Sequence, residues 1–587
     1  MTEQHGGRII AERLQAHGVQ HLFTLCGGHI SPINVAIKER GMQVVDVRDE
    51  ASAVFGADAI SRVTGGIGVA AVTAGPGVTN TITAVKNAQM AQSPILIFGG
   101  ATPTILMGRG SLQDIDQMEL MRPLTKWCTS VRTVRSLGAT VDKAIRIAKE
   151  GVPGPVFIEV PIDVLYPEHL VHDMYMDESG LDNPQGLAEN ALKMYLDAHL
   201  ARQFHQPDLS VNLPRPRLRN IVQSVSHKTQ IERARAAIQK AERPVLVLGS
   251  QTMVNRGPQE AERIADAVRA LGIPVWLGGM GRGLLGRFSD IQFRHKRTAA
   301  LKEADLVLVM GFPFDFRLTY GRSISSKATL IAANLSMRDL TKNRMPDIPI
   351  LAHPGDVLEE LAQQPPTNQN SWKPWFETLR KRENARDEDI KQQGSTEGEK
   401  GVNPIAFFLK MEEAMDDDAT LVVDGGDFVG TAAYTLRPRG PLSWLDPGVF
   451  GTLGVGGGFA VGAAVARPES ETWLIYGDGS SAYSLAEVDT ALRVGVAPIL
   501  VIGTDASWGQ IARDQVTILG SDAATTLLFT DYHKVAEGYG GVGILVTKLD
   551  QVDDALKQAK AHAKAGKPVC INVHLAPSNF REGSISM

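Results

Sequence analysis

The sequence predicts three consecutive α/β domains whose sheets are mostly parallel. Short apolar runs alternate with amphipathic segments along most of the chain, which is the pattern of strands joined by crossover helices. Two stretches interrupt it: a helical insert with a proline-containing linker, and a polar linker of mixed charge. We therefore expect domains at 1–170, 229–365 and 401–575, the insert and linkers at 171–228 and 366–400, and a polar tail at 576–587.

The composition predicts a soluble globular enzyme. The chain has 587 residues, of which 43% are hydrophobic and 21% are charged, and this length suits about three or four domains. A formal net charge of −5 without a basic tract argues against a nucleic-acid partner. Cys26, Cys128 and Cys570 show no pairing or metal-binding spacing, and neither a signal-peptide core nor a long apolar span is present. We expect a cytoplasmic protein with no membrane span.

The first domain begins with a helix at residues 8–18, which stops at a glycine. Apolar runs then predict strands at 21–25, 44–47, 68–72, 95–98 and 156–160. Because amphipathic segments separate these runs, the strands are expected to lie parallel to one another.

Four features of this domain are candidates for chemistry. Glu50 follows a strand, where a carboxylate usually caps a helix. The segment Thr73–Asn80 contains Gly-Pro-Gly and reads by itself as a tight turn before a helix. His29 follows two glycines, and Gln113 lies in a polar loop. Taken alone, each has an ordinary structural explanation.

The insert after the first domain contains an apolar-striped helix at 187–204. We interpret it as a surface insert that packs on its own domain, with a lid or an oligomer contact as the alternative.

The second domain has predicted strands at 245–248, 274–277, 306–309 and 329–332. The segments GSQ (249–251) and GFPFDFR (311–317) end two of these strands, where a nucleotide can bind in this class of fold. Three basic residues either contact phosphates or form a solvated face; they are Arg282, Arg317 and Arg322.

In the third domain, a strand at 420–423 ends in Asp424-Gly-Gly-Asp427-Phe428, and the last predicted strand of the chain is at 570–573. A glycine-rich segment after Gly451 mimics the dinucleotide-binding pattern, but no clean strand and no acidic partner accompany it. We therefore do not interpret it as a dinucleotide site.

The most informative stretch runs from Trp473 to Gln510. It predicts strand, turn, helix and strand, with Asp478 and Asp505 at the carboxyl ends of the two strands. In a right-handed parallel crossover these ends meet at the same edge of the sheet, so the two acids can share one hard cation. The glycines beside Asp478 allow a phosphate to approach the backbone, and Ser480 and Ser481 offer N–H groups to it.

Taken together, Glu50 and the Gly477–Gly479 block with its interval to Asp505 resemble the signature of thiamine diphosphate (ThDP) enzymes. The resemblance implies that Asp478, Asp505 and the Ser507 carbonyl bind Mg²⁺ on the cofactor's diphosphate. It also implies that Glu50 bonds the pyrimidine ring and promotes the tautomer that activates the cofactor. Thr504-Asp505 replaces the usual Asn-Asn, which adds a negative charge beside the diphosphate.

The resemblance also assigns the remaining contacts to the cofactor. Leu453 would wedge beneath it and impose a bent conformation, and the Gly451 carbonyl would accept from its amino group. The cofactor-binding residues implied in this way are Glu50, Thr73, Pro76, Asn80, Gly426, Asp427, Phe428, Gly451, Leu453, Gly477, Gly479, Ser480, Ser481, Ser507, Trp508 and Gly509.

Several longer segments, among them TLCGGHISP and WLDPGVFGTLGVGGGFA, resemble acetolactate-synthase-like proteins that act as 2-hydroxyacyl-CoA lyases. The resemblance implies reversible cleavage of a 2-hydroxyacyl-CoA to an aldehyde and formyl-CoA, the reverse being an acyloin-type condensation. His29 and Gln113 occupy the positions at which benzaldehyde lyase places its polar active-site groups, so they are the candidates for proton transfer to and from the substrate.

Three alternative functions have their own sequence requirements. Acetolactate synthases usually carry Phe and Trp where this chain has Leu112 and Asp514. Benzaldehyde-lyase-type cleavage of free hydroxy ketones stays open, because no CoA-specific motif is visible. A catalytically inactive regulatory subunit would be expected to lack Glu50 or Asp478, and both are present.

The resemblance further implies partners. The middle domain of this family holds FAD, holds ADP, helps to bind CoA, or holds nothing; we expect ADP or CoA here. Because Glu50 and the diphosphate site come from different subunits in the family, we expect a homodimer or homotetramer that acts on a small molecule. The tail at 576–587 is expected to be disordered or to close over the site.

Overall fold

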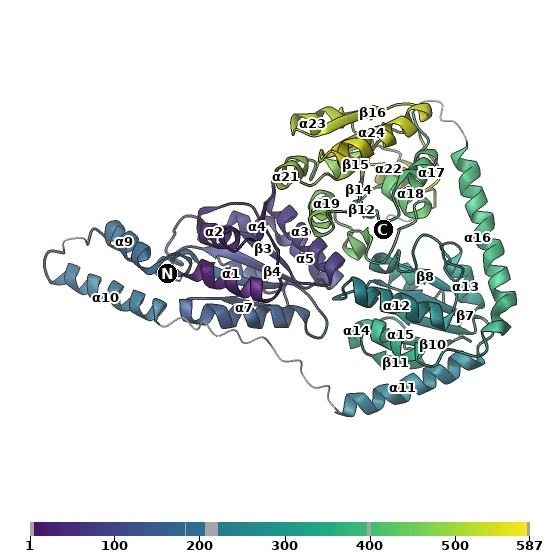
Figure 1. The fold of residues 1–587 in the computed structure, drawn as a ribbon, viewed down its shortest axis with the longest axis horizontal. Coiled ribbons are helices and arrows are strands. Elements are labelled where there is room, and N and C mark those ends of the chain that lie inside the picture. Colours follow the sequence, from purple (N-terminus) through teal and green to yellow (C-terminus); the bar gives the residue numbers. More distant parts are fainter. Residues whose placement is uncertain (1–4, 182–183, 206–220, 396–400, 584–587) are drawn as a thin grey trace. The chain divides into compact units, whose positions relative to one another are not determined.

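The computed structural model describes residues 5–181, 184–205, 221–395 and 401–583 (Figure 1). Contacts divide the chain into two compact units, which are described separately. The first comprises residues 1–61 and 66–216, and the second comprises residues 62–65 and 217–587. The predicted linker at 205–219 lies almost entirely outside the described residues, as do the last four residues of the tail.

The first unit is built on a six-stranded sheet with the strand order β2-β1-β3-β4-β6-β5. Its strands are β1 (His21–Thr24), β2 (Gln43–Asp46), β3 (Gly68–Val72), β4 (Ile95–Ala101), β5 (Trp127–Ser130) and β6 (Val156–Pro161). Its helices are α1 (Gly6–Ala16), α2 (Ser31–Glu39), α3 (Glu50–Thr64), α4 (Pro76–Asn80), α5 (Ile82–Ala91), α6 (Gln117–Met121), α7 (Val134–Lys149), α8 (Ile162–Leu165), α9 (Glu168–Ser179) and α10 (Leu187–Phe204).

The second unit contains two sheets, of which the first has five strands in the order β11-β10-β9-β7-β8. These strands are β7 (Pro244–Leu248), β8 (Val275–Leu277), β9 (Leu306–Met310), β10 (Thr329–Asn334) and β11 (Ile348–Leu351). The accompanying helices are α11 (Ile221–Lys240), α12 (Pro258–Leu271), α13 (Arg297–Glu303), α14 (Met337–Leu340), α15 (Pro354–Ala362) and α16 (Lys373–Gly394).

The other sheet of the second unit has six strands in the order β13-β12-β14-β15-β17-β16. Its strands are β12 (Thr420–Val423), β13 (Trp444–Leu445), β14 (Thr472–Gly477), β15 (Ile499–Thr504), β16 (Val542–Val546) and β17 (Val569–His574). Its helices are α17 (Pro404–Ala414), α18 (Asp427–Thr435), α19 (Val455–Ala466), α20 (Asp478–Ser481), α21 (Glu487–Val494), α22 (Gly509–Leu519), α23 (Tyr532–Gly538) and α24 (Val552–Lys564).

The three sheets share one topology. Pairing between the named strands is parallel throughout, so the predicted α/β class is confirmed. Counted within each domain, the strand order begins 2-1-3-4 in all three sheets. The order reverses between the first and third strands, and the carboxyl ends of these strands open a crevice where α/β proteins bind ligands. The switch points are β1/β3, β7/β9 and β12/β14.

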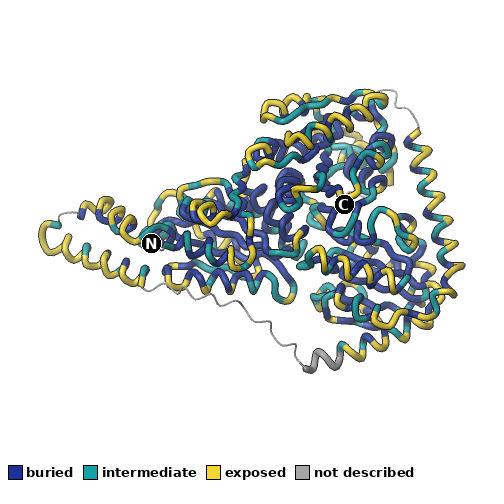
Figure 2. The backbone as a smooth tube through the Cα atoms, viewed as in Figure 1, coloured by how far each residue is buried: buried dark blue, intermediate teal, exposed yellow. Residues whose placement is uncertain are grey.

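Central strands are buried on both faces, which is why they read as continuous apolar runs (Figure 2). Four strands were absent from the sequence prediction: β5, β11, β13 and β16. All four lie at an edge of their sheet. Three of them have half-exposed or exposed positions, and β13 has only two residues. Edge strands carry less continuous apolar sequence, so hydrophobic runs did not reveal them.

The predicted helix of the insert is present as α10, which pairs with α9 through a small cluster of Val171, Tyr175 and Leu200. Much of the outer surface of α10 is exposed (Figure 2). The charge-mixed linker contains the long helix α16, as expected. None of the helices among the described residues is both long enough and apolar enough to cross a membrane. The predicted domain boundaries remain predictions.

Candidate active site

Glu50 is the first residue of α3 and its side chain lies at the carboxyl edge of the first sheet. It is 7% exposed. Asn80 Nδ2 donates to Glu50 Oε2 at 3.0 Å, and a Cβ placed on Gly77 would lie 3.6 Å from Glu50 Oε1. The structure thus brings the predicted residues Glu50 and Asn80 together and closes one side of the carboxylate with the backbone of α4.

His29 and Thr73 follow the strands β1 and β3, at the switch point of the same sheet. His29 Nδ1 and Thr73 Oγ1 are 3.2 Å apart and hydrogen bonded. Burial lowers the pKa of His29 below its usual value, so the imidazole is neutral near pH 7 and its ring can accept or donate a proton.

Gln113 lies over the Gly-Pro-Gly turn. Its backbone is left-handed, with φ 63°, and a Cβ on Gly75 would come within 3.0 Å of the Gln113 Cβ. Pro76 follows Gly75 and begins α4. The six candidates predicted in this unit therefore gather at the carboxyl ends of β1 to β4 and the loops that follow them.

Gln117 is a supporting residue that the sequence prediction missed. It is buried, accepts from Gly75 N at 3.0 Å, and donates to Gly100 O at 3.0 Å and to Glu159 Oε2 at 2.9 Å. These bonds fix the turn before Pro76. The only local signal was a second glutamine in a polar loop, which has no periodic pattern to mark it.

The second group of candidates lies at the ends of β14 and β15, which pair in register from Trp473 with Ile499 to Gly477 with Gly503. Asp478 is 2% exposed; its Oδ1 accepts from Gly479 N and its Oδ2 from Ala506 N, each at 2.8 Å. Asp505 Oδ1 accepts from Ser507 N at 3.1 Å. The two acids share one sheet edge, as the crossover argument predicts.

The electrostatics of this pair call for a cation. Burial raises the pKa of Asp478 to about 6. The pKa of Asp505 is raised to about 7, first by desolvation and next by the negative charge of Asp478. Because both pKa values are raised, it is unfavourable to ionise the two carboxylates at the same time. A hard divalent cation, which prefers oxygen ligands, stabilises their charged forms. The donor set therefore fits Mg²⁺ with a diphosphate.

Other predicted residues line the same edge. The Trp508 ring lies against Gly479, where a Cβ would be 2.5 Å from the ring. A Cβ on Gly509 would lie 3.1 Å from Asp505 Oδ2 and 3.7 Å from Asp427 Oδ2. The hydroxyls of Ser480 and Ser481 donate to backbone carbonyls, including Gly425 O and Asp478 O, so both hydroxyls help to fix the turn after β14.

Asp424 holds the loop that contains Leu453, the residue predicted to lie beneath the cofactor. Asp424 is the second supporting residue whose role in the site was not predicted. Asp424 is buried and accepts from Gly454 N at 3.1 Å and Gly456 N at 2.7 Å. These bonds set the loop that carries Gly451 and Leu453. Leu453 covers Gly425, because a Cβ there would lie 2.2 Å from Leu453 Cδ2.

Gly426, Asp427 and Phe428 follow the end of β12 and have different surroundings. Gly426 has φ 114°, which favours glycine, and Asp427 after it begins α18. Phe428 is buried instead: its ring lies 4.4 Å from Phe408 between centroids and against Gly503. Its contacts are therefore with the core of the domain.

Comparisons with known proteins agree with this geometry. Three family models match the chain: the N-terminal binding domain of thiamine pyrophosphate enzymes at residues 4–120, the central domain at 231–361 and the C-terminal binding domain at 424–573. The chain belongs to the thiamine pyrophosphate enzymes, and thiamine diphosphate is its cofactor.

Relatives of full length are also found. The 2-hydroxyacyl-CoA lyase 2 of Danio rerio is 48% identical over 598 residues, covering 100% of this chain and 94% of that protein. The protein of the same name from Homo sapiens is 44% identical, covering 100% and 92%. The acetolactate synthase large subunit IlvG of Mycobacterium tuberculosis is 32% identical over 576 residues, covering 98% and 96%.

Proposed function

We propose that this protein is a ThDP- and Mg²⁺-dependent carbon–carbon lyase that cleaves a 2-hydroxyacyl-CoA to an aldehyde and formyl-CoA. The observation that carries the proposal is the similarity, along the whole chain, to proteins named 2-hydroxyacyl-CoA lyase 2. The candidate site supports it, because Glu50, Asp478 and Asp505 are present and His29 and Gln113 lie near the turn at Gly75.

The cofactor supplies a nucleophilic carbon and an electron sink when it is bound. Glu50 would bind the pyrimidine ring and exchange a proton with it, and Asn80 orients the Glu50 carboxylate. His29, neutral because its pKa is lowered, would accept the proton of the substrate's 2-hydroxyl group, while Thr73 fixes the direction of the imidazole ring. Gln113 would bind the substrate oxygen. Asp478, Asp505 and the Ser507 carbonyl would hold Mg²⁺.

A basic cavity of about 790 Å³ in the second unit offers a site for the nucleotide part of CoA. Its walls carry six cationic side chains and three aromatic rings. These residues are Arg282, Arg294, Lys296, Arg297, Lys302, Arg386, Trp276, Phe293 and Tyr434. CoA carries three phosphate groups and an adenine. ADP also carries an adenine but has fewer phosphate groups.

Three of the arginines of this cavity have charges that are available to a ligand, whereas Arg386 forms an ion pair with Asp389. Arg282 Nη1 donates to Ala433 O at 3.0 Å, Arg294 Nη2 to Leu436 O at 3.3 Å and Arg297 Nη2 to Arg317 O at 2.6 Å. These acceptors are neutral carbonyls, so they position the guanidinium groups without cancelling their charge. Burial, then the positive charge of Arg437, lowers the pKa of Arg294 to about 10. An anion is therefore favoured here.

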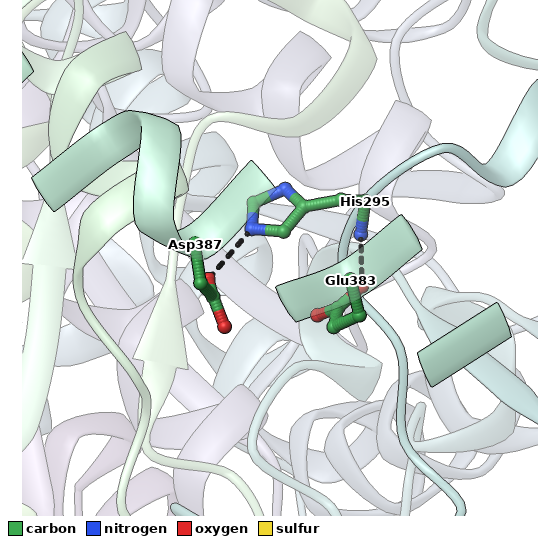
Figure 3. A group of neighbouring side chains, drawn as sticks. All are labelled: His295, Glu383 and Asp387. Atoms are coloured by element: carbon green, nitrogen blue, oxygen red, sulfur yellow. Dashed lines mark hydrogen bonds and ion pairs between the residues drawn. The ribbon is translucent and has the colours of Figure 1, made fainter. Parts of the chain in front are cut away.

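The loop that carries Arg294 to Arg297 is fixed by α16, as Figure 3 shows for His295. Glu383 accepts from the backbone N–H groups of Arg294 and His295, each at 3.0 Å. Asp387 bonds His295 Nε2 at 3.1 Å and Arg437 Nη2 at 3.2 Å. His295, Glu383 and Asp387 are close enough to suggest a metal site, but because both carboxylates are used and arginines surround them, we interpret the cluster as an anchor.

We also propose a homodimer or homotetramer whose subunits share active sites, as the resemblance to thiamine diphosphate enzymes implies. A cytoplasmic location is proposed from the three free cysteines, Cys26, Cys128 and Cys570.

The proposal is tested by parallel assays with ThDP and Mg²⁺, using a 2-hydroxyacyl-CoA, benzoin and pyruvate as separate substrates. Formyl-CoA and aldehyde from the thioester alone, lost in Glu50→Gln, are the expected result. Turnover of benzoin alone would make the protein a hydroxy-ketone lyase, with His29 and Gln113 in the same roles. Formation of acetolactate from pyruvate would overturn the distinction based on Leu112 and Asp514.

A further inference from the structure

Arg513, on α22, forms an ion pair at the edge of the diphosphate site. Its Nη2 donates to both oxygens of Asp427, at 2.7 and 2.6 Å. Arg513 was not among the predicted site residues, whereas Asp427 was. Both side chains are largely buried, with 21% and 25% of their surface exposed, so the pair is shielded from solvent more than an ordinary surface ion pair.

Asp427 is the third carboxylate at this edge. Its Oδ2 and Asp505 Oδ2 both lie within 4 Å of the position that a Cβ on Gly509 would take. The negative charge of Asp427 also contributes to the raised pKa of Asp505, after desolvation and Asp478. A diphosphate brought to Asp427, Asp478 and Asp505 would meet excess negative charge, which one divalent cation offsets only in part.

The same arginine ties the C-terminal segment to this site. Arg513 Nη1 donates to the Arg581 carbonyl. The Arg581 guanidinium lies 5.1 Å from the Tyr434 ring centroid, and a Cβ on Gly430 would be 2.8 Å from Arg581 Nε. Phe580 packs edge-on against Tyr434 at 5.9 Å. Arg513 therefore joins three elements: the start of α18, helix α22 and residues 580–581.

Helix α22 has little apolar anchoring. It begins two residues after Ser507, and none of its residues is buried. Its position therefore depends on polar contacts such as those of Arg513. The Nε atom of Arg513 is itself buried and has no hydrogen-bond partner among the described residues, which leaves one donor of this guanidinium available beside an anion site.

We propose that Arg513 is a positioning residue for cofactor binding: it neutralises Asp427, which makes a third carboxylate compatible with the diphosphate, and it holds α22 and residues 580–581 against α18. The proposal rests on the Mg²⁺–diphosphate site proposed above but not on the identity of the substrate. It explains how the additional acids at 427 and 505 are tolerated in a diphosphate site.

The test measures binding of ThDP at saturating Mg²⁺ by isothermal titration calorimetry, for the full-length protein and four variants. Arg513→Met should weaken binding by about tenfold or more, because it leaves a carboxylate uncompensated near the diphosphate. Asp427→Asn keeps the size and one acceptor oxygen of this predicted cofactor-binding side chain and removes its charge, so it should bind ThDP at least as tightly as the wild type. The double variant should recover most of the loss, because both charges are then absent.

Arg493→Met is the matched control: it breaks the Arg493–Asp489 pair on α21, which has an N–O distance of 2.8 Å in the same domain, and should bind ThDP like the wild type. Hydrogen exchange should increase in α22 and at residues 577–583 in Arg513→Met and not in the control. If Arg513→Met proves unstable, Arg513→Lys keeps the charge and should retain most of the affinity.

Unchanged affinity in Arg513→Met would overturn the proposal. So would a double variant that binds no better than Arg513→Met, because a purely structural role predicts no rescue by Asp427→Asn. Failure of the lyase assay with intact ThDP binding would reject the proposed substrate and leave this inference standing.

Discussion

Asp424 illustrates how the surroundings of one residue define its role. It accepts two backbone N–H bonds, from Gly454 and Gly456, and both bonds favour the charged carboxylate. Burial opposes them and is the larger effect, so the pKa of Asp424 is raised to about 7. A residue that reads as part of an Asp-Gly-Gly turn is thus the anchor of the loop that carries Leu453.

The raised pKa of Asp424 predicts a pH-dependent stability. Because the folded state binds this proton more tightly than the unfolded state does, the protonated carboxyl contributes stability below the unfolded pKa. That contribution falls as the pH rises from about 4 to about 7. Above about pH 7 the free energy of unfolding no longer depends on the titration of Asp424. In Asp424→Asn the contribution is absent. The difference in free energy of unfolding between wild type and Asp424→Asn, measured without cofactor by denaturant titration between pH 5 and 8, should therefore fall with pH.

Parallel stability curves for the two proteins would show that Asp424 does not titrate in this range. Asp550→Asn serves as the control, because this acid lies in a surface turn before α24 and should leave the pH dependence unchanged.

At the scale of elements, α16 connects the basic cavity with the second and third sheets. Trp375 and Leu379 pack into the core beside β9 and β10, while Glu383 and Asp387 bind the loop before α13. A polar linker helix therefore fixes the loop that carries three of the cavity's six cationic side chains, Arg294, Lys296 and Arg297, and contributes a fourth, Arg386, itself.

Truncation of Glu383 should loosen this cavity. Glu383→Ala leaves the backbone N–H groups of Arg294 and His295 without their partner, so the guanidinium groups lose their fixed positions. We expect the KM for a 2-hydroxyacyl-CoA to rise by about five- to tenfold with less than about a twofold change in kcat, because the lost contact binds the ground state and the transition state equally. Steady-state kinetics measure both constants.

Glu388→Ala is the matched control on the same helix, since Glu388 is 71% exposed and forms an ion pair with Lys391 on the surface of that helix. A fall in kcat with an unchanged KM in Glu383→Ala would place the cavity outside substrate binding.

At the scale of the whole molecule, one strand order serves three purposes. The first sheet presents Glu50, His29 and Gln113, and the third sheet presents Asp478, Asp505 and Leu453, both at their carboxyl edges. The middle sheet has the same switch point, between β7 and β9, but its cationic cavity includes residues that follow β8. A conserved topology thus carries three different sets of side chains.

Shared active sites predict complementation between two inactive variants. Glu50→Gln removes the acid for the pyrimidine, and Asp478→Asn removes a cation ligand. If each site takes these residues from different subunits, a mixed dimer contains one intact site and one doubly altered site. Co-refolded or co-expressed in equal amounts, the two variants should recover up to about a quarter of the wild-type activity, measured by formyl-CoA release.

Each variant alone provides the baseline for this experiment. Activity of the mixture no higher than the mean of the two would show that each site is built from a single chain.

Much of the fold and several residues of the candidate site can be predicted from local sequence. Glu50 follows the edge strand β2 after a short turn. Central strands are continuous apolar runs because both faces are buried, and Asp478 and Asp505 stand directly after two such strands of the third sheet. Parallel crossovers then place the acids at one sheet edge. For these residues, the position along the chain is sufficient to predict the position in the fold.

The tertiary structure alone decided which distant residues support them. Gln117 reaches Gly75 and Glu159, Asp424 reaches Gly456, Glu383 fixes the loop at Arg294, and Arg513 joins Asp427 to the C-terminal segment. Such contacts link segments that are far apart in the chain, so they leave no periodic pattern and no short motif in the sequence. The sequence by itself determined the class of fold and the cofactor, because these depend on local runs and strand-end residues. The packing of separate segments determined the charge balance around the cofactor and the basic cavity, because charge and shape there are summed over residues that meet only in the folded chain.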